Sequence, residues 1–224
     1  MSWSRGKDSK EGGEGAGRDA GKRGYHHGNL REALIKAALD LIKAKGPAGF
    51  TFAEAARAAG VSPAAPYRHF RDRDELMADL ARQGFDRFER FLATAWNEGR
   101  PDIFTAFSNI GKAYLAFART EPAYYSAMFE AGLPLDDYPD LRQAGDRAFS
   151  ILRGGAEALC QTLPAVGRPP AMMMALHIWS MSHGIASLFA RGDAGRRKLP
   201  MTPEDLLEAG TLIYLQGLGI SDKR

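Results

Sequence analysis

Apolar residues recur along most of this chain every three to four positions, which is the spacing of an amphipathic α-helix. In the first such stretch, from Asn29 onward, they stand at positions 30, 33/34, 37/38 and 41/42, and Gly46-Pro47 ends the pattern. No alternating strand pattern and no internal repeat is visible. The chain is therefore predicted to be all-α, with later helices at about 102–119, 121–131, 139–162, 170–191 and 203–218.

Residues 51–59 predict a short helix with a well-defined start. Thr51 can cap this helix, and Glu54, three residues further on, can bond back to the Thr51 backbone, which is the pattern of a capping box. Gly60 follows and supplies a turn.

A second short helix is predicted at 63–70. Ser62 stands at its N-cap position, and Pro63 suits the first helical position, where no backbone N–H is needed. Two short helices about three residues apart, the second with aromatic and basic side chains, are typical of a helix-turn-helix that reads a DNA major groove. Pro66 removes a backbone donor inside this helix, so we expect its start to be distorted.

Asp72 and Glu75 repeat the capping pattern and open a long helix that runs to about Asn97. Such a helix can connect a DNA-reading head to a larger body, so that a shift of its far end moves the head. Its apolar stripe consists of Leu76, Leu80, Gly84, Phe88 and Leu92. The predicted organisation is an arm at 1–24, a helix-turn-helix domain at 25–75, a connecting helix at 76–98 and a C-terminal domain at 99–219.

The charge of the 224-residue chain is unevenly distributed. Residues 21–76 hold ten Lys and Arg against six Asp and Glu, a net charge of +4, whereas residues 77–224 hold sixteen against seventeen, a net charge of −1. A basic face of this kind attracts phosphates whatever the base sequence. The positive excess therefore coincides with the predicted DNA-reading block.

The first 24 residues contain seven glycines and mixed charges without apolar periodicity. We expect them to be a disordered arm, because they cannot bury enough surface to offset chain entropy. Its end, which includes Arg23, either lies in a minor groove beside the main contact or is an idle tail. No apolar signal segment is visible, so a bacterial cytoplasm is the expected location.

Residues 171–190 contain no charged side chain, which raises the question of a membrane span. His177, His183 and three serines argue against a span. A helix that is apolar on nearly every side is also expected where one face meets its own core and the other meets a second subunit. The single cysteine, Cys160, cannot form an internal disulfide and is expected to be a small packed side chain.

The N-terminal block resembles the tetracycline-repressor (TetR) family of bacterial regulators. The matching residues are Thr51, Ala56, Ala59-Gly60-Val61-Ser62, Tyr67-Arg68-His69-Phe70, Arg73 and Leu76, preceded by Gly24-Tyr25-His26-His27-Gly28-Asn29-Leu30-Arg31. Trp179, His183 and Gly184 are similar to the Trp-His-Gly signature that names the C-terminal domain of one subgroup. The resemblance implies a dimeric transcriptional regulator, usually a repressor, that binds a palindromic operator in double-stranded DNA at the nucleoid.

DNA contacts are predicted from the chemistry of the exposed end of the head. Small side chains let the backbone approach base edges, hydroxyls and helix N-termini favour phosphates, and Arg68 can reach either a base or a phosphate. His69 is either a phosphate contact or a helix-packing residue, and Phe70 is expected in the core. The predicted DNA-binding residues are Arg23, Thr51, Ser62, Ala64, Ala65, Tyr67, Arg68, His69 and Arg73.

The C-terminal domain is predicted to dimerise and to hold a small apolar or aromatic effector. Dimerisation through the last two helices is what the family resemblance implies. For the effector, aromatic and Met side chains with a few polar groups suit the lining of a cavity. The alternative for each of them is a place in the ordinary core. The candidate lining residues are Phe107, Tyr114, Phe117, Tyr124, Tyr125, Met128, Phe129, Met173, His177 and Trp179.

We expect no enzymatic activity, because no glycine-rich phosphate loop, nucleophile elbow or metal-ligand cluster is visible. Adjacent histidines at 26 and 27 lack ligand spacing, so no metal and no cofactor is expected. The alternative function is a helical small-molecule-binding or interaction protein that retains the fold without specific DNA binding.

Overall fold

The computed structural model describes residues 30–164, 168–190 and 200–219, and every regular element in these ranges is helical. This confirms the predicted all-α class. In chain order the elements are α1 (Leu30–Lys45), α2 (Phe52–Ala58), η1 (Pro66–Arg68), α3 (Arg73–Trp96), η2 (Asn97–Gly99), α4 (Ile103–Thr120), α5 (Pro122–Phe129), η3 (Leu135–Asp137), α6 (Pro139–Gln161), α7 (Ala171–Ala190) and α9 (Pro203–Gly217).

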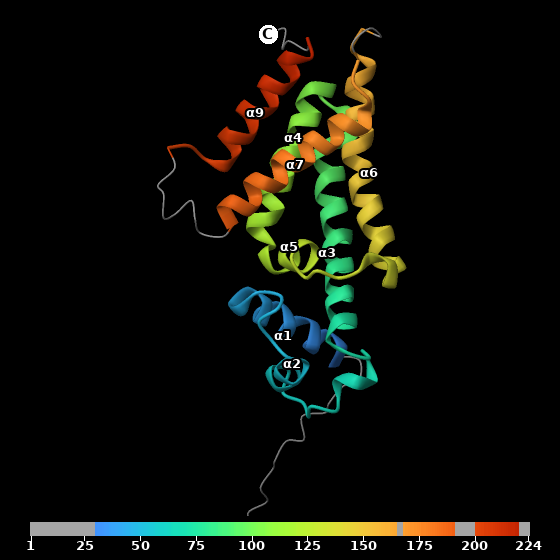
Figure 1. Ribbon diagram of the computed structural model, residues 1–224, viewed down its shortest axis with the longest axis vertical. Helices are drawn as coiled ribbons and strands as arrows, with labels where there is room; N and C mark the ends of the chain where they lie inside the picture. Colours follow the sequence, from blue (N-terminus) through green and yellow to red (C-terminus); the bar gives the residue numbers. More distant parts are fainter. Residues whose placement is uncertain (1–29, 165–167, 191–199, 220–224) are drawn as a thin grey trace, which may run out of the picture.

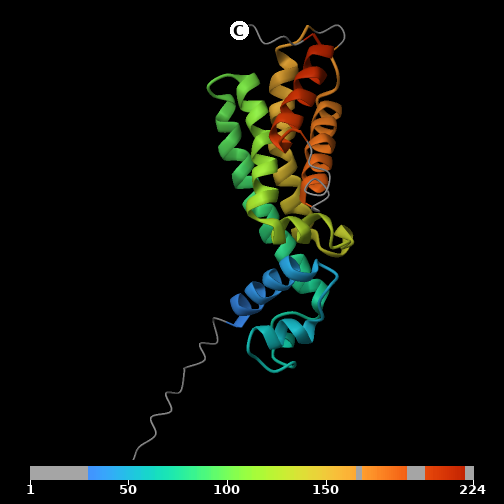
Figure 2. The same ribbon diagram turned by 90° about the vertical axis from the view of Figure 1, so that its left-hand side faces the viewer.

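The molecule is elongated, with a small head at one end and a helical body at the other (Figures 1 and 2). The head consists of α1, α2, η1 and the first turns of α3. In the body, α4, α5 and α6 pack against the remainder of α3, while α7 packs on α4 and α6, and α9 packs on α4 and α7. Helix α3 runs through both parts and packs beside α6 in the body. A shift of its body end can therefore move the head.

The start of α3 is fixed by reciprocal hydrogen bonds close to the predicted ones. The Asp72 carboxylate accepts from the Glu75 N–H at 2.8 Å, while the Glu75 carboxylate accepts from the N–H of Arg71 at 2.5 Å. The helix ends where Asn97 adopts a left-handed φ of 43°. The predicted apolar stripe is buried at Leu76, Leu80, Gly84, Phe88 and Leu92.

The head has its own apolar core, in which Phe50, Phe52 and Phe70 are buried together with the inner face of α1. The expectation that Phe70 is a core residue is therefore confirmed. The guanidinium of Arg31 lies over the Phe70 ring at 5.6 Å and forms an ion pair with Asp79 of α3 at 2.7 Å. Helix α1 is thus tied to the long helix.

Helices α3 and α5 approach closely at Gly84. A Cβ built on Gly84 would lie 2.7 Å from Met128 Sδ, which is too near for any larger residue without a shift of Met128. Helix α5 also packs against α1 of the head. The body therefore contacts the head through α5 as well as through α3.

The C-terminal helices α7 and α9 pack on each other, and His177 Nδ1 lies 3.2 Å from the hydroxyl of Tyr214. No helix in the described ranges is both long and apolar enough to span a membrane, as expected for 171–190. Cys160 is buried, which raises the pKa of its thiol, and its Sγ lies 3.6 Å from the Pro169 carbonyl oxygen. Burial agrees with the packed role predicted for it.

Candidate nucleic-acid interface and body cavity

The first helix of the predicted helix-turn-helix begins with a complete capping box. The Thr51 hydroxyl accepts from the Glu54 N–H at 3.2 Å, and the Thr51 N–H donates to the Glu54 carboxylate at 2.8 Å. Lys45 Nζ donates to the same carboxylate at 2.9 Å. The bonds from Thr51 and Lys45 lower the pKa of Glu54 from 4.5 to about 2.

Replacing Glu54 with glutamine is expected to lower stability near neutral pH and to matter less in acid. The lowered pKa means that the folded state holds the carboxylate in its charged form. The contribution is therefore complete above pH 4.5 and is lost as the pH falls toward about 2. The urea midpoints of wild type and Glu54→Gln should converge as the pH falls over this range. The control is Glu157→Gln, which removes an exposed carboxylate of the body, and its midpoint should not converge with that of wild type in this way.

The predicted second helix at 63–70 is wrong in type. After Gly60, whose φ of +74° makes the turn, only Pro66–Arg68 are helical, as one turn of 3₁₀-helix. Pro66 has no N–H to donate to Ser62 as an α-helix would require, and the Ser62 carbonyl instead accepts from Ala65 at 3.0 Å. The expected distortion at Pro66 therefore extends over the whole segment.

The segment nevertheless presents its polar side chains outward from two buried anchors, Pro66 and Phe70. Tyr67 is 62% exposed, and its ring meets Phe52 edge-on at a centroid distance of 5.1 Å. Arg68 and His69 are exposed beside it. Of the other predicted contacts here, Ser62 and Ala64 are exposed and Ala65 is half-buried.

Arg73, predicted to contact a phosphate, is bonded to groups within the head. Its guanidinium donates to the carbonyls of Phe50, at 3.0 Å, and Pro47, and lies 4.9 Å from the centroid of the Phe50 ring. It also pairs with Asp74 at 3.1 Å. With these partners Arg73 holds the loop after α1 against the start of α3. Arg73 thus positions the head from inside.

The two remaining predicted contacts are Thr51 and Arg23. Thr51 is exposed, but its hydroxyl and N–H are both engaged with Glu54 in the capping box. Arg23 lies outside the described residues, as does the whole predicted arm at 1–24. Apart from Thr51, the predicted contacts that are exposed are therefore Ser62, Ala64, Tyr67, Arg68 and His69.

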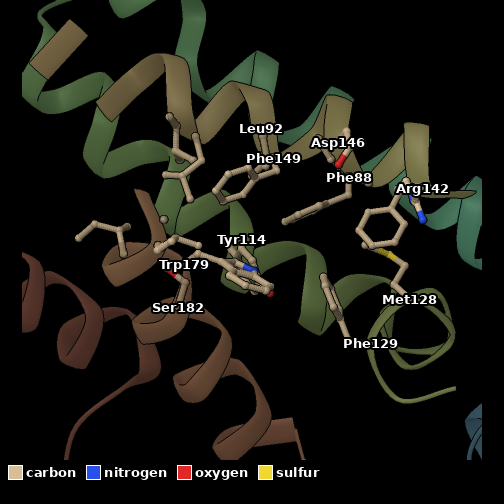
Figure 3. Close-up of a pocket in the computed structure, with 18 of the residues that line it drawn as sticks. Phe88, Leu92, Tyr114, Met128, Phe129, Arg142, Asp146, Phe149, Trp179 and Ser182 are labelled. Atoms are coloured by element: carbon tan, nitrogen blue, oxygen red, sulfur yellow. The ribbon is translucent and has the colours of Figure 1, made fainter. Parts of the chain in front are cut away.

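The body contains a cavity of about 400 Å³ between α3, α4, α5, α6 and α7 (Figure 3). Its wall is largely aromatic and aliphatic, and its polar groups belong to Tyr114, Arg142, Asp146, Trp179 and Ser182. The exposed lining residues Leu135, Arg142, Asp146 and Leu176 mark its mouth, beside η3 and the outer edge of α7. A space of this size and composition suits a small, mostly apolar molecule.

Four of the predicted lining residues, Tyr114, Met128, Phe129 and Trp179, do form the wall. The other six do not, which corrects the prediction for them. Four of these are packed elsewhere in the buried core: Phe107, Phe117, Tyr124 and Tyr125. Met173 and His177 lie one turn apart on the exposed side of α7, so they point away from the cavity.

Sequence reasoning missed much of the wall, notably Phe85 and Phe88 of α3 and Phe149 of α6. A usable signal was present for Phe88, because it belongs to the apolar stripe of the long helix. Phe85 and Phe149 are half-buried and lie off the main stripes of their helices. Only the packing of α3 against α6 brings them to one space.

A polar cluster adjoins the cavity. The hydroxyls of Tyr114 and Tyr125 each lie 2.9 Å from His183 Nδ1. Burial, with a smaller effect from Tyr125, raises the pKa of Tyr114 far above its ordinary value, so this phenol stays protonated. Tyr114 lines the cavity, Tyr125 lies on α5 and His183 on α7, so the cluster joins three helices. The described residues contain no group of His, Cys, Asp and Glu that could hold a metal ion.

Two family models match the chain. Residues 34–80 match the model described as bacterial regulatory proteins, tetR family, and residues 107–212 match the model of a tetracyclin repressor-like C-terminal domain. The first covers the head and the second covers the body. The Trp-His-Gly subgroup stays a prediction: Trp179 and His183 are in ring contact at 6.0 Å, while Gly184 is exposed on the outer side of α7.

Several solved structures have similar folds. A protein of unknown function from Rhodococcus sp. RHA1 is 25% identical, with a TM-score of 0.71 over 88% of this chain and 98% of that one. The TetR family transcriptional regulator PfmR from Thermus thermophilus is 18% identical, with a TM-score of 0.62 over 83% and 96%. The fatty acid degradation regulator FadR from Bacillus halodurans is 12% identical, with a TM-score of 0.62 over 82% and 93%.

Proposed function

The chain belongs to the tetR family of bacterial regulatory proteins and is a DNA-binding transcriptional regulator, and from this premise we propose that it is a homodimeric repressor gated by a small molecule. In this proposal the body cavity binds an apolar or aromatic effector, and its occupation releases a palindromic operator. The protein acts by binding, without catalysis, on nucleoid DNA in the cytoplasm. The observation that carries the proposal is that α3 bears cavity residues at one end and the anchored head at the other.

The DNA-binding part of the proposal is supported by the exposed segment after Gly60. Tyr67, Arg68 and His69 project from a segment whose flanking Pro66 and Phe70 are buried, so their positions relative to the head are fixed. Hydroxyl and cationic groups suit phosphates, and Arg68 can also bond a guanine edge. In a dimer, two such segments about 34 Å apart would enter successive major grooves on one side of the duplex.

The dimer part is supported by the outer faces of α7 and α9. Large apolar side chains are exposed there at helical spacing: Met172, Met173, Leu176, Leu188, Leu212 and Ile213. Gly184 and Gly217 lie on the same faces, and a Cβ on either would meet no described atom within 4 Å. Exposed apolar side chains with small residues among them suit close packing against a second copy. A twofold axis would then present the two heads in parallel.

The gating part is supported by the contacts of α3 and α5. Phe85, Phe88 and Leu92 of α3 and Met128 of α5 line the cavity, and α5 packs on α1 of the head. A molecule that prefers one separation of these helices would change the spacing of the two heads. The molecule can release DNA only if it binds more tightly to the head spacing that does not fit DNA than to the spacing that does.

A titration of DNA by fluorescence anisotropy tests the proposal, with duplex from upstream of the protein's own gene and a scrambled duplex at two salt concentrations. We expect a salt-sensitive complex with the first duplex. Arg68→Ala is expected to weaken it about tenfold, which is typical of one lost charged contact. If Arg68 contacts a phosphate, the variant should lose affinity for both duplexes, and the slope of log affinity against log salt concentration should be smaller by about 1. If Arg68 contacts a base, the variant should lose affinity for the first duplex alone.

The matched control is Arg153→Ala, which removes an exposed arginine from α6 of the body and should leave both titrations unchanged. The alternative function is a helical small-molecule-binding or interaction protein without specific DNA binding. A protein that binds both duplexes equally, or neither, would support that alternative and contradict the repressor proposal.

A further inference from the structure

The wall of the body cavity contains aromatic rings from five helices, α3 to α7. Phe85 and Phe129 meet edge-on at 5.5 Å, Phe88 and Tyr114 at 5.0 Å, and Phe149 and Trp179 at 6.2 Å; all six rings line the cavity. Aromatic faces carry negative electrostatic potential and attract cations, most strongly where water is excluded. The wall is therefore suited to a positively charged group as well as to an apolar one.

An exposed carboxylate stands where this wall meets the mouth. Asp146 of α6 lines the cavity and lies one turn before Phe149 on the same helix. A Cβ on the neighbouring Gly145 would lie 3.8–3.9 Å from ring carbons of Phe85, so Phe85 of α3 packs beside this turn of α6. Among the described residues, Asp146 has no ion-pair partner within 4.0 Å. Its charge is thus available to a molecule in the cavity.

The charges around the mouth are mainly negative. From η3 to the second turn of α6, Asp136, Asp137 and Asp140 are exposed, and Arg142 is the cation of that stretch. Arg142 lines the cavity but is paired with Asp136. An incoming anion would have to compete with Asp136 for this guanidinium, whereas an incoming cation is attracted by the rim as a whole.

We propose that the effector of the body cavity is a hydrophobic organic cation, whose apolar part fills the aromatic cavity and whose positive group lies between Asp146 and the neighbouring rings. This inference rests on the proposed function, because it names the class of molecule that the regulatory site takes. A carboxylate ligand meets the acidic rim and a paired arginine. A neutral ligand gains the apolar contacts but forms no ion pair with Asp146.

Isothermal titration calorimetry on the full chain, without DNA, tests this with three probes that share a naphthalene ring. They are 2-naphthylmethyl-trimethylammonium, 2-naphthylmethanol and 2-naphthylacetate. We expect the cation to bind about tenfold more tightly than the alcohol, from one charge pair and the cation–π contacts, and the carboxylate to bind most weakly. Asp146→Asn should lower the affinity for the cation about fivefold, because the cation–π contacts remain, and should leave that for the alcohol unchanged.

Two variants of α6 serve as matched controls. Asp140→Asn removes the same charge from the rim but not from the cavity wall, so it should weaken cation binding by only about twofold. Arg142→Gln should not weaken cation binding. The proposal is overturned if the carboxylate binds best and loses affinity in Arg142→Gln, if Asp146→Asn leaves the preference for the cation unchanged, or if none of the three probes binds.

The same probes added to the protein–DNA complex separate this inference from the proposed function. Cation binding with release of DNA supports both. Cation binding without release leaves the ligand class standing and contradicts the gating. Release by the neutral or anionic probe, but not by the cation, supports the gating and overturns the ligand class.

Discussion

Ile213→Glu is expected to convert the protein from a dimer to a monomer and to weaken operator binding about 100-fold or more. Ile213 is 69% exposed on the outer face of α9, beside the exposed Leu212. In the proposed dimer this position would be buried, and an unpaired carboxylate buried in an apolar interface costs several kcal/mol. Once the dimer separates, each head binds its half-site alone, and the roughly hundredfold or larger advantage of joined binding is lost.

Analytical ultracentrifugation measures the oligomeric state of this variant, and fluorescence anisotropy measures its affinity for DNA. The matched control is Gln143→Glu, which adds the same charge to an exposed position of α6 away from the apolar face of α7 and α9. The control should remain a dimer with unchanged affinity. A dimeric Ile213→Glu protein would show that α9 is not the dimer interface, and a monomeric variant with full affinity would contradict the requirement for two heads.

The mouth of the cavity lies at the edge of this apolar face, because Leu176 of α7 belongs to both. Trp179 and His183 follow on the inner side of the same helix, where Trp179 lines the cavity and His183 contacts Tyr114. A rotation of α7 that moves its inner side therefore also moves its outer side. This geometry provides a physical route from an occupied cavity to the relative placement of two protomers, in addition to the route through α3.

The helices could be predicted closely from sequence because their limits have local causes. Helix α6 occupies 139–161 against the predicted 139–162, and α9 occupies 203–217 against 203–218. Proline at the first position of a helix and glycine after its end act within a few residues, so no knowledge of packing is needed. The capping boxes at Thr51 and Thr202 are of the same kind, although only the first was recognised.

The site was less predictable, because it depends on which way each helix faces. Helix α7 is apolar on nearly every side, so periodicity could not separate Trp179, which lines the cavity, from Met173 and His177, which face outward. In the head, Ser62 at the N-cap position and Pro63 after it predicted a regular second helix. The structure instead has a single 3₁₀ turn at Pro66–Arg68, because Pro66 lacks the N–H that an α-helix needs there.

Phe88 occupies the centre of the connection between head and body. It lies on α3, is 4% exposed, and its ring contacts Tyr114 and Phe117 of α4 at 5.0 Å and Phe129 of α5 at 6.5 Å. The same ring forms part of the cavity wall. Removal of this ring would add its volume to the existing cavity. The surrounding helices could not move inward far enough to fill the cavity and the vacated space together.

Phe88→Ala is therefore expected to lower the free energy of unfolding by about 3–5 kcal/mol, measured by urea denaturation followed by circular dichroism. The matched control is Phe91→Ala, one turn later on the same helix, where the ring is 38% exposed and contacts Phe117 at 5.4 Å. That substitution should cost only about 1 kcal/mol, because less apolar surface returns to water and no closed volume is left. Equal losses in the two variants would mean that the cavity wall does not support the fold, and that α3 is held in place by its other contacts.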